Sequence, residues 1–263
     1  MSKQAERENY LLTLLNTTNR ISTREAVEIL AVSDATARRI FANMEKSGKI
    51  IRDYGGIQLA RRTMHYSFEE SEQVFKLEKQ RIGRLAATFI NNGDTIYLDC
   101  GTTVFQMTLA INELLASGEL KTLNIITNSI ANVQTIVPMP SCHVVLVGGE
   151  YNRKRRDFSG PLTEKYVAPF HFTKSFFGCD GLSVSMGFSS NQIDISSLNT
   201  VVMERTEHSF ALLDNSKFEK CSLMTYAQPA DIEAIVTNLA PLAMLHKALT
   251  DARVKIHIAG KNG

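Results

Sequence analysis

The chain has 263 residues and a net charge of +2, and its 44% hydrophobic and 21% charged residues predict a globular protein with room for a small and a larger domain. It contains no apolar run near the roughly 18 residues of a membrane span, no signal-peptide pattern at its start, and four cysteines that form no CxxC pair. We therefore expect a cytoplasmic protein with no membrane contact, no metal site and no cofactor.

The charge is distributed unevenly along the chain. Residues 1–66 hold 11 lysines and arginines against 7 aspartates and glutamates, whereas the remainder holds 18 against 20. A basic amino-terminal part suits a polyanion such as nucleic acid. The excess is modest, so the identification of a partner depends on the motifs within this part.

Two helices and a tight turn are predicted at the start. The first helix spans about Gln4–Asn16, and the second runs from a capping-box pattern at Ser22–Glu25 to about Leu30. A short turn at Ala31–Val32 follows, and Ser33 is a good N-cap for a third helix. Two short helices joined by such a turn form the helix-turn-helix pattern.

The third helix, from Asp34, has two different faces when its residues are placed about 100° apart. The inward face carries Ala37, Ile40, Phe41 and Met44, and the outward face carries Ala35, Arg38, Arg39, Ala42 and Lys46. Small residues allow close approach to a surface, and arginine donates to phosphates or to the edge of guanine. Taken alone, the same pattern also fits an ordinary amphipathic helix with solvated charges.

A wing is predicted after this helix. Gly48–Leu59 reads as two short strands around the Gly55–Gly56 turn. We therefore predict a winged helix-turn-helix DNA-binding domain over residues 1–60. Its predicted DNA contacts are Ser33, Ala35, Thr36, Arg38, Arg39, Lys49, Arg52 and Tyr54.

Residues 61–78 are polar and weakly periodic, which predicts a linker to a larger domain over residues 79–263. A helix is expected over about Val74–Asn91. Beyond it, helical stretches alternate with apolar runs at Thr95–Asp99, Leu123–Thr127, His143–Val147, Lys174–Gly178, Ser209–Leu213, Ala234–Thr237 and Val254–Ile258. This alternation predicts a mainly parallel α/β sheet covered by helices.

Polar loops follow several of these strands, and ligands of parallel sheets bind beyond the carboxyl ends of strands. In the loop Asp99–Thr103, a glycine allows close approach, and the hydroxyls and helix-start N–H groups favour a phosphate. Each loop alone is also an ordinary tight connection. Together they predict a ligand site with Asp99, Gly101, Thr102, Thr103, Thr127, Asn128, Asp180 and Lys217.

The chain resembles the DeoR family of bacterial transcriptional repressors. In the first domain the resemblance rests on Val32-Ser33, Thr36, Arg38-Arg39, Arg52 and Gly55-Gly56. In the second it rests on Asp99 with Gly101–Thr103, Thr127-Asn128, Gly148-Gly149, Gly178 with Asp180-Gly181, and Asp214 with Ser216-Lys217. One departure is Ile40, which stands where many members have an aspartate, so operator affinity or preference can differ.

The resemblance implies a sensor domain similar to ribose-5-phosphate isomerase, in a repressor of a carbohydrate-utilisation operon released by a phosphorylated sugar. It implies double-stranded operator DNA as a partner, and recognition helices usually work in pairs, so we expect a homodimer or tetramer.

Two other functions stay open from the sequence. A sugar-phosphate isomerase or deaminase with an accessory winged helix is one, although Ser183 stands where the isomerases have a second carboxylate and is a poor base without a histidine. A protein-binding winged helix is the other. The basic run Arg153–Arg156 has two interpretations, a mobile loop over an anionic ligand or a solvated loop.

Overall fold

The computed structural model describes residues 7–8, 10–12, 14–15, 20–46, 50–53, 55–59, 66–136 and 142–260. The chain divides into two compact units, Met1–His65 and Tyr66–Gly263, which we call the head and the body. Two predicted DNA-contacting residues, Lys49 and Tyr54, lie outside the described residues. In the described part of the chain, no helix is long and apolar enough to cross a membrane.

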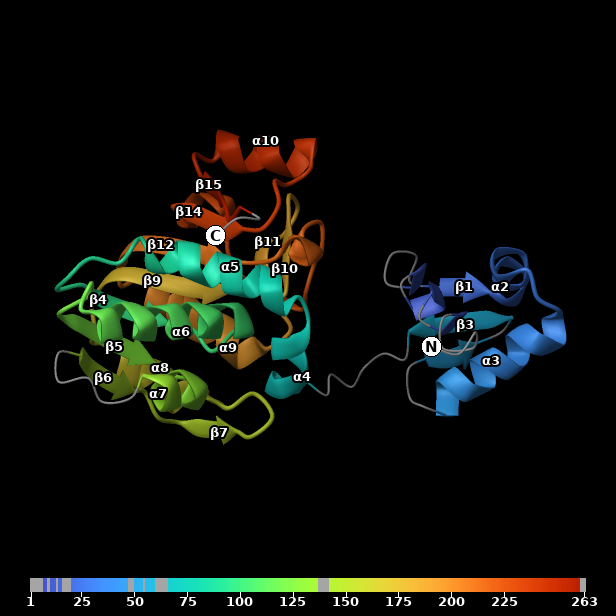
Figure 1. Ribbon diagram of the computed structural model, residues 1–263, viewed down its shortest axis with the longest axis horizontal. Helices are drawn as coiled ribbons and strands as arrows, with labels where there is room; N and C mark the ends of the chain where they lie inside the picture. The colour runs from blue at the N-terminus through green and yellow to red at the C-terminus, as the bar shows by residue number, and fades with distance from the viewer. Residues whose placement is uncertain are drawn as a thin grey trace. The chain divides into compact units, whose positions relative to one another are not determined.

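The head has the predicted order of helix, turn, helix and hairpin (Figure 1). The described residues between 7 and 15 are helical, and the later elements are β1 (Arg20–Ser22), α2 (Thr23–Leu30), α3 (Asp34–Lys46), β2 (Ile50–Asp53) and β3 (Gly56–Leu59). Strand β3 pairs antiparallel with both β1 and β2. Sequence analysis does not predict β1, because three residues are too few to show a strand's alternation.

The capping box at the start of α2 is confirmed. Ser22 Oγ accepts a hydrogen bond from the Glu25 N–H at 3.1 Å, and the Glu25 carboxylate accepts one from the Ser22 N–H at 2.7 Å. The helix ends at Ala31, whose φ of +48° makes the left-handed turn that leads into α3. Local sequence therefore sets the angle at which α3 begins.

The body is built on a seven-stranded sheet in the order β15-β14-β12-β9-β4-β5-β6, and all its neighbouring strands are parallel. The strands are β4 (Thr95–Leu98), β5 (Leu123–Thr127), β6 (Cys142–Leu146), β9 (Phe172–Gly178), β12 (Thr206–Leu212), β14 (Ala234–Thr237) and β15 (Lys255–Ile258). Each was predicted from its apolar run, and the predicted α/β fold is confirmed. The chain builds one half from β4 to β6 and the other from β9 to β15, so the order reverses between β4 and β9.

Helices cover both faces of this sheet because alternate strand residues point to opposite faces. In β4, Ile96 and Leu98 join one core cluster and Tyr97 joins the other. Helices α5 (Lys76–Ala87) and α6 (Thr102–Ser117) pack into the first cluster, and Figure 1 shows them lying across that face. Helices α8 (Pro161–Val167), α9 (Ile193–Met203) and α10 (Ala243–Asp251) pack into the second, and α7 (Ile130–Thr135) lies against α6.

Two smaller antiparallel sheets surround the central one. Strands β7 (Glu150–Asn152) and β8 (Asp157–Ser159) form a hairpin around residues 153–156. Strands β10 (Gly181–Ser183), β11 (Gly187–Ser190) and β13 (Met224–Ala227) form the other sheet. Sequence analysis predicted neither sheet, and both border the loops described below.

The linker predicted over residues 61–78 is wrong from Phe68 onward. Helix α4 (Phe68–Gln73) and the first turn of α5 lie within that stretch. Phe68 is buried, and its ring meets that of Phe105 on α6 edge to face at 5.3 Å between centroids. Because one aromatic anchors an otherwise acidic segment, its composition resembles that of a linker although it is docked on the body.

Candidate functional site

The outward face of α3 is exposed as predicted. Ala35, Arg38 and Arg39 are exposed, and the inward residues are buried. The Arg38 guanidinium donates to the Asp34 carboxylate one turn earlier, and this hydrogen bond raises the pKa of Arg38. Among the described residues, Arg39 has no hydrogen-bond or ion-pair partner. Ile40 is 4% exposed in the head core, so the departure from the family pattern lies on the inward face.

The turn before α3 and the wing carry the other predicted DNA contacts. Ser33 Oγ accepts a hydrogen bond from the Thr36 N–H at 3.3 Å and lies 2.9 Å from the Thr36 hydroxyl. In the wing, the Arg52 N–H donates to the Glu45 carboxylate at 3.3 Å. The Arg52 guanidinium lies 3.9 Å from the same group. This carboxylate belongs to α3, so it ties the wing to that helix.

In the body, the predicted ligand residues begin at the switch point between β4 and β9. Asp99, directly after β4, accepts a hydrogen bond from the Gly178 N–H at 2.9 Å. Gly101 faces the same glycine, since a Cβ on it would lie 3.5 Å from the Gly178 Cα. Burial raises the pKa of Asp99, and its Oδ1 is buried without a partner among the described residues. A buried acceptor without a donor is costly, so this oxygen suits a ligand hydroxyl.

Lys79 of α5 supplies a cation at the start of α6. Its Nζ donates to Thr102 Oγ1 at 2.9 Å and to the Ser71 carbonyl at 2.6 Å. Burial lowers the pKa of Lys79 to about 8, a shift that the Asp214 charge opposes and the Lys217 charge adds to. No side chain caps the start of α6. The buried ammonium and the helix N-terminus therefore favour an anion at the same place.

A close helix contact brings Lys79 to this position. A Cβ on Gly83, one turn later on α5, would lie 2.5 Å from the Met107 amide nitrogen on α6. Only glycine permits this approach of the two helices. The spacing of α5 from α6, and hence the reach of Lys79 to Thr102, depends on this glycine.

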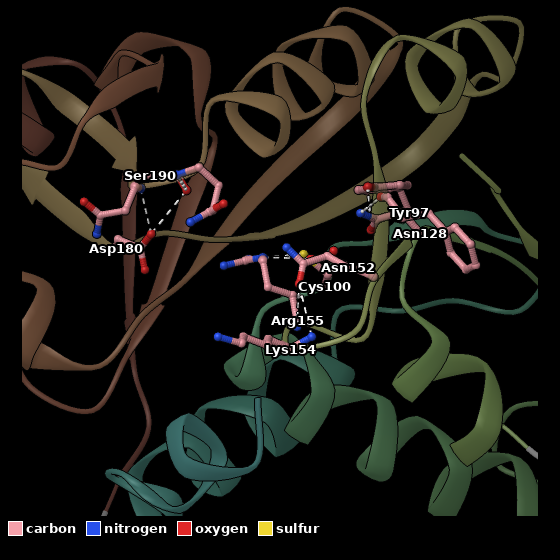
Figure 2. A network of polar contacts seen from close by, with 12 residues as sticks. Tyr97, Cys100, Asn128, Asn152, Lys154, Arg155, Asp180 and Ser190 are labelled. Atoms are coloured by element: carbon pink, nitrogen blue, oxygen red, sulfur yellow. Dashed lines mark hydrogen bonds and ion pairs between the residues drawn. The ribbon is translucent and has the colours of Figure 1, made fainter. Parts of the chain in front are cut away.

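Arg155 provides a second buried cation (Figure 2). It is 7% exposed. Its Nε donates to Asp157 Oδ2 at 2.9 Å and its Nη2 to Cys100 Sγ at 3.6 Å. Its Cζ lies 4.3 Å from the centroid of the Tyr66 ring. Among the described residues, Nη1 has no partner. The solvated interpretation of the basic run is therefore wrong for Arg155, although Arg153 and Lys154 are exposed.

Asp180 and Lys217 are half-buried and are the remaining charged residues of the predicted ligand site. The Asp180 carboxylate accepts from Ser190 Oγ at 3.2 Å and from the Asn191 N–H at 2.9 Å (Figure 2). Burial raises the pKa of Cys179, a shift that the Lys217 charge opposes and the Asp180 charge adds to, so both charges lie near this thiol. We call the whole group the strand-end cluster: Lys79, Asp99, Gly101, Thr102, Thr103, Arg155, Asp180 and Lys217.

Thr127 and Asn128 are next to this cluster but are engaged inside the protein. Both are fully buried. Thr127 Oγ1 donates to the Leu98 carbonyl at 2.6 Å, and Asn128 accepts from the Tyr97 hydroxyl at 3.0 Å while donating to the Phe158 carbonyl at 2.9 Å. These bonds fix the loop after β5, so the two residues hold the loop next to the cluster in place.

Sequence analysis missed Lys79, Arg155 and Tyr66 as site residues. One signal was readable for Lys79, which shares the buried stripe of α5 with Ile82, Gly83 and Ala86. A lysine on an apolar stripe needs a partner or a function. Arg155 had no such signal, because it lies in a run of four basic residues and only the β7–β8 hairpin turns it inward.

Ser183, which stands where the isomerases have a second carboxylate, is not placed to act as a base. Ser183 is 4% exposed, accepts a hydrogen bond from the Met186 N–H at 3.2 Å and lies 3.1 Å from Cys221 Sγ. Within the described residues, no group of three or more His, Cys, Asp and Glu side chains is placed to hold a metal ion.

Comparison with known proteins covers both units. A family profile described as a DeoR-like helix-turn-helix domain matches residues 7–63, and one described as a DeoR C terminal sensor domain matches residues 75–239. The chain is 26% identical over 97% of its length to the glycerol-3-phosphate regulon repressor of Escherichia coli, covering 99% of that protein. It is 29% identical over 86% of its length to the lactose phosphotransferase system repressor of Staphylococcus epidermidis, covering 88% of it.

Solved structures with partial similarity include the ribose 5-phosphate isomerase A of Methanocaldococcus jannaschii. The TM-score is 0.41 at 14% identity, over 55% of each chain. The eIF2B beta structure from Chaetomium thermophilum gives a TM-score of 0.46 at 14% identity, over 70% of this chain and 56% of that one.

Proposed function

The chain belongs to the DeoR family of DNA-binding transcriptional regulators and not to a family of enzymes, and from this premise we propose that it represses a carbohydrate-utilisation operon in the cytoplasm. A phosphorylated sugar bound in the body releases it from operator DNA. The names of two relatives, a glycerol-3-phosphate regulon repressor and a lactose phosphotransferase system repressor, support this assignment.

The DNA interface in this proposal is the exposed face of α3 with the wing. Arg39 has no partner among the described residues, and Arg38 is held by Asp34, so a free and a positioned guanidinium lie next to one another. Ser33, Ala35, Thr36 and the wing residues Lys49, Arg52 and Tyr54 complete the interface. Arginine reads guanine in the major groove, and the wing suits the backbone or minor groove.

The effector site in this proposal is the strand-end cluster, and the observation that carries it is the pair of buried cations at the switch point. Phosphate binds at Gly101, Thr102 and Thr103 with Lys79 and Lys217, and Arg155 beside Cys100 adds a further cation, because the helix start and the positive charges favour an anion. Asp99 and Asp180 accept hydrogen bonds from the sugar hydroxyls. Thr127 and Asn128 contribute indirectly, by fixing the loop beneath.

The regulator binds double-stranded operator DNA as a homodimer or tetramer, with two heads on one palindromic site. Sedimentation of the full-length protein tests this assembly. A monomer at micromolar concentration would contradict it.

A thermal-shift screen tests the effector. The probes are D-ribose 5-phosphate, D-glucose 6-phosphate, D-fructose 6-phosphate and glycerol 3-phosphate, each beside its unphosphorylated counterpart. A ligand at 100 times its dissociation constant adds about 2.7 kcal/mol to the free energy of unfolding. At least one phosphorylated compound should raise the melting temperature while its counterpart does not. Equal shifts from both members of every pair, or no shift at all, would contradict a phosphate-binding site.

A further inference from the structure

The first residues of the body, Tyr66–Gln73, contact the strand-end cluster through its two buried cations. Lys79 donates to Thr102 in the cluster and to the Ser71 carbonyl in α4. Arg155 contacts Cys100 beside the cluster and lies over the ring of Tyr66. Each of the two buried cations of the cluster is thus also a contact of this segment.

The hairpin loop that carries Arg155 holds the same segment in two more places. The Phe68 N–H donates to the Lys154 carbonyl at 2.9 Å. The Arg156 guanidinium lies 5.4 Å from the Phe68 ring centroid and 3.9 Å from the Glu69 carboxylate. On the other side, Glu72 accepts from Gln106 of α6 at 3.1 Å. The segment is therefore docked between the β7–β8 hairpin and α6.

Both cations have N–H donors that the described contacts leave unused. An ammonium has three N–H donors and a guanidinium five. The described contacts use two on Lys79 and two on Arg155. An anion can therefore bind to the unused donors of either cation without displacing Ser71 or Tyr66, and it would offset the desolvation that the charge bears in its absence.

We propose that Tyr66–Gln73 is an effector-responsive segment: an anion in the strand-end cluster completes the coordination of Lys79 and Arg155 and so fixes the segment in its docked position. The proposal rests on the effector site proposed above and adds its route of action. Tyr66 directly follows the head in the chain, at the division between the two units. A ligand that favours the docked segment shifts the protein toward the states compatible with it.

Hydrogen exchange on the full-length protein tests the proposal, with inorganic phosphate and D-ribose 5-phosphate as probes. Amides of residues 68–73 should exchange several-fold more slowly with a probe that raises the melting temperature. Without any probe, Arg155→Lys should speed exchange of the Phe68 amide, because lysine lacks the planar fork that stacks on Tyr66. Arg153→Ala is the matched control, since it removes a charge from the same loop at an exposed position and should behave like wild type.

A fluorescence measurement covers the case in which Arg155→Lys does not fold. The chain contains no tryptophan, so Tyr66→Trp places a single fluorophore beneath Arg155. Its emission should change when the probe binds, whereas that of Tyr166→Trp, at an exposed position on α8, should not.

The outcomes separate this proposal from the effector site itself. A raised melting temperature with unchanged exchange at residues 68–73 and unchanged Tyr66→Trp emission would overturn the effector-responsive segment alone. No rise in melting temperature with any phosphorylated probe would overturn both the effector site and the segment's response.

Discussion

In the head, Arg38 and Arg39 lie on the exposed face of α3, whereas in the body Lys79 and Arg155 are 5% and 7% exposed. Exposed cations keep their full hydration. Their attraction to a polyanion depends on how many of them contact it, and salt screens that attraction strongly. Buried cations have lost hydration, so one well-placed anion gains more from each of them. We therefore propose that the two regions bind anions of different size by different means.

The largest effect is expected on the exposed face. Arg39→Ala should weaken operator binding about 5- to 150-fold, which corresponds to about 1–3 kcal/mol for an arginine that reads a base. Arg205→Ala is the control, because it removes one charge from an exposed position in the body. Gel-shift titrations at two salt concentrations measure both variants. Equal affinities for Arg39→Ala and the control would show that α3 does not read the operator.

The buried site should be sensitive to helix spacing. Gly83→Ala places a Cβ 2.5 Å from the Met107 backbone nitrogen, so α5 must shift away from α6. We expect a loss of about 1–3 kcal/mol in the free energy of unfolding and weaker effector binding, because Lys79 moves with α5. Gly148→Ala is the control, since its Cβ meets no atom within 4 Å. Urea unfolding of both variants with the same midpoint would contradict the close contact.

The buried cation Lys79 also titrates, unlike the exposed arginines of the head. The pKa of Lys79 is lowered to about 8 by burial, so its ammonium loses its proton above that pH. Effector affinity should fall as the pH rises through about 8, while a phosphate stays fully ionised. The unfolded chain holds this proton more tightly, so stability should rise with pH between about 8 and 10.5.

Calorimetric titration of the effector at pH 7 and pH 9 checks this dependence. Lys79→Arg keeps its charge throughout that range and should bind with nearly constant affinity. The same decrease in both proteins would assign the titration to another group.

The last comparison removes the same group, a serine hydroxyl that caps a helix, once in the head and once in the body. Ser22→Ala should cost the head about 1 kcal/mol, because water can replace part of the lost capping bond. Ser129 caps α7 by accepting from the Asn132 N–H and is fully buried, so Ser129→Ala should cost the body about 1–3 kcal/mol. Calorimetric unfolding of the two variants measures both losses. A larger loss for the head variant would contradict the role of burial.

The sequence predicted the head and the central sheet well because both are encoded locally. Helix α3 was oriented from four inward residues, and all of them are buried. The seven parallel strands were located because each is a short apolar run between polar loops. Strands such as β10 and β11, with the sequences GLS and GFSS, were missed because neighbouring chain segments, not side-chain alternation, place them in a sheet.

The proposed effector site was only partly predictable. Asp99, Gly101, Thr102, Asp180 and Lys217 follow strands, so the fold rule locates them. Lys79 and Arg155 come from a helix and a hairpin far away in the sequence, and only tertiary contacts place them beside Thr102 and Cys100. Thr127 and Asn128 follow a strand as well, but buried hydrogen bonds within the protein occupy their polar groups.

The most direct measurement titrates the effector into the complex of Thr102→Ala with operator DNA. The operator is obtained by binding selection with the wild-type protein, and the effector is the phosphorylated sugar with the largest thermal shift. Thr102→Ala should fold and bind the operator like wild type, because the change lies in the body. Thr88→Ala, at an exposed position on the body, is the control. We predict that effector concentrations that release wild type and the control leave Thr102→Ala on the DNA. Release of Thr102→Ala at the wild-type concentration would contradict an effector site at the strand-end cluster.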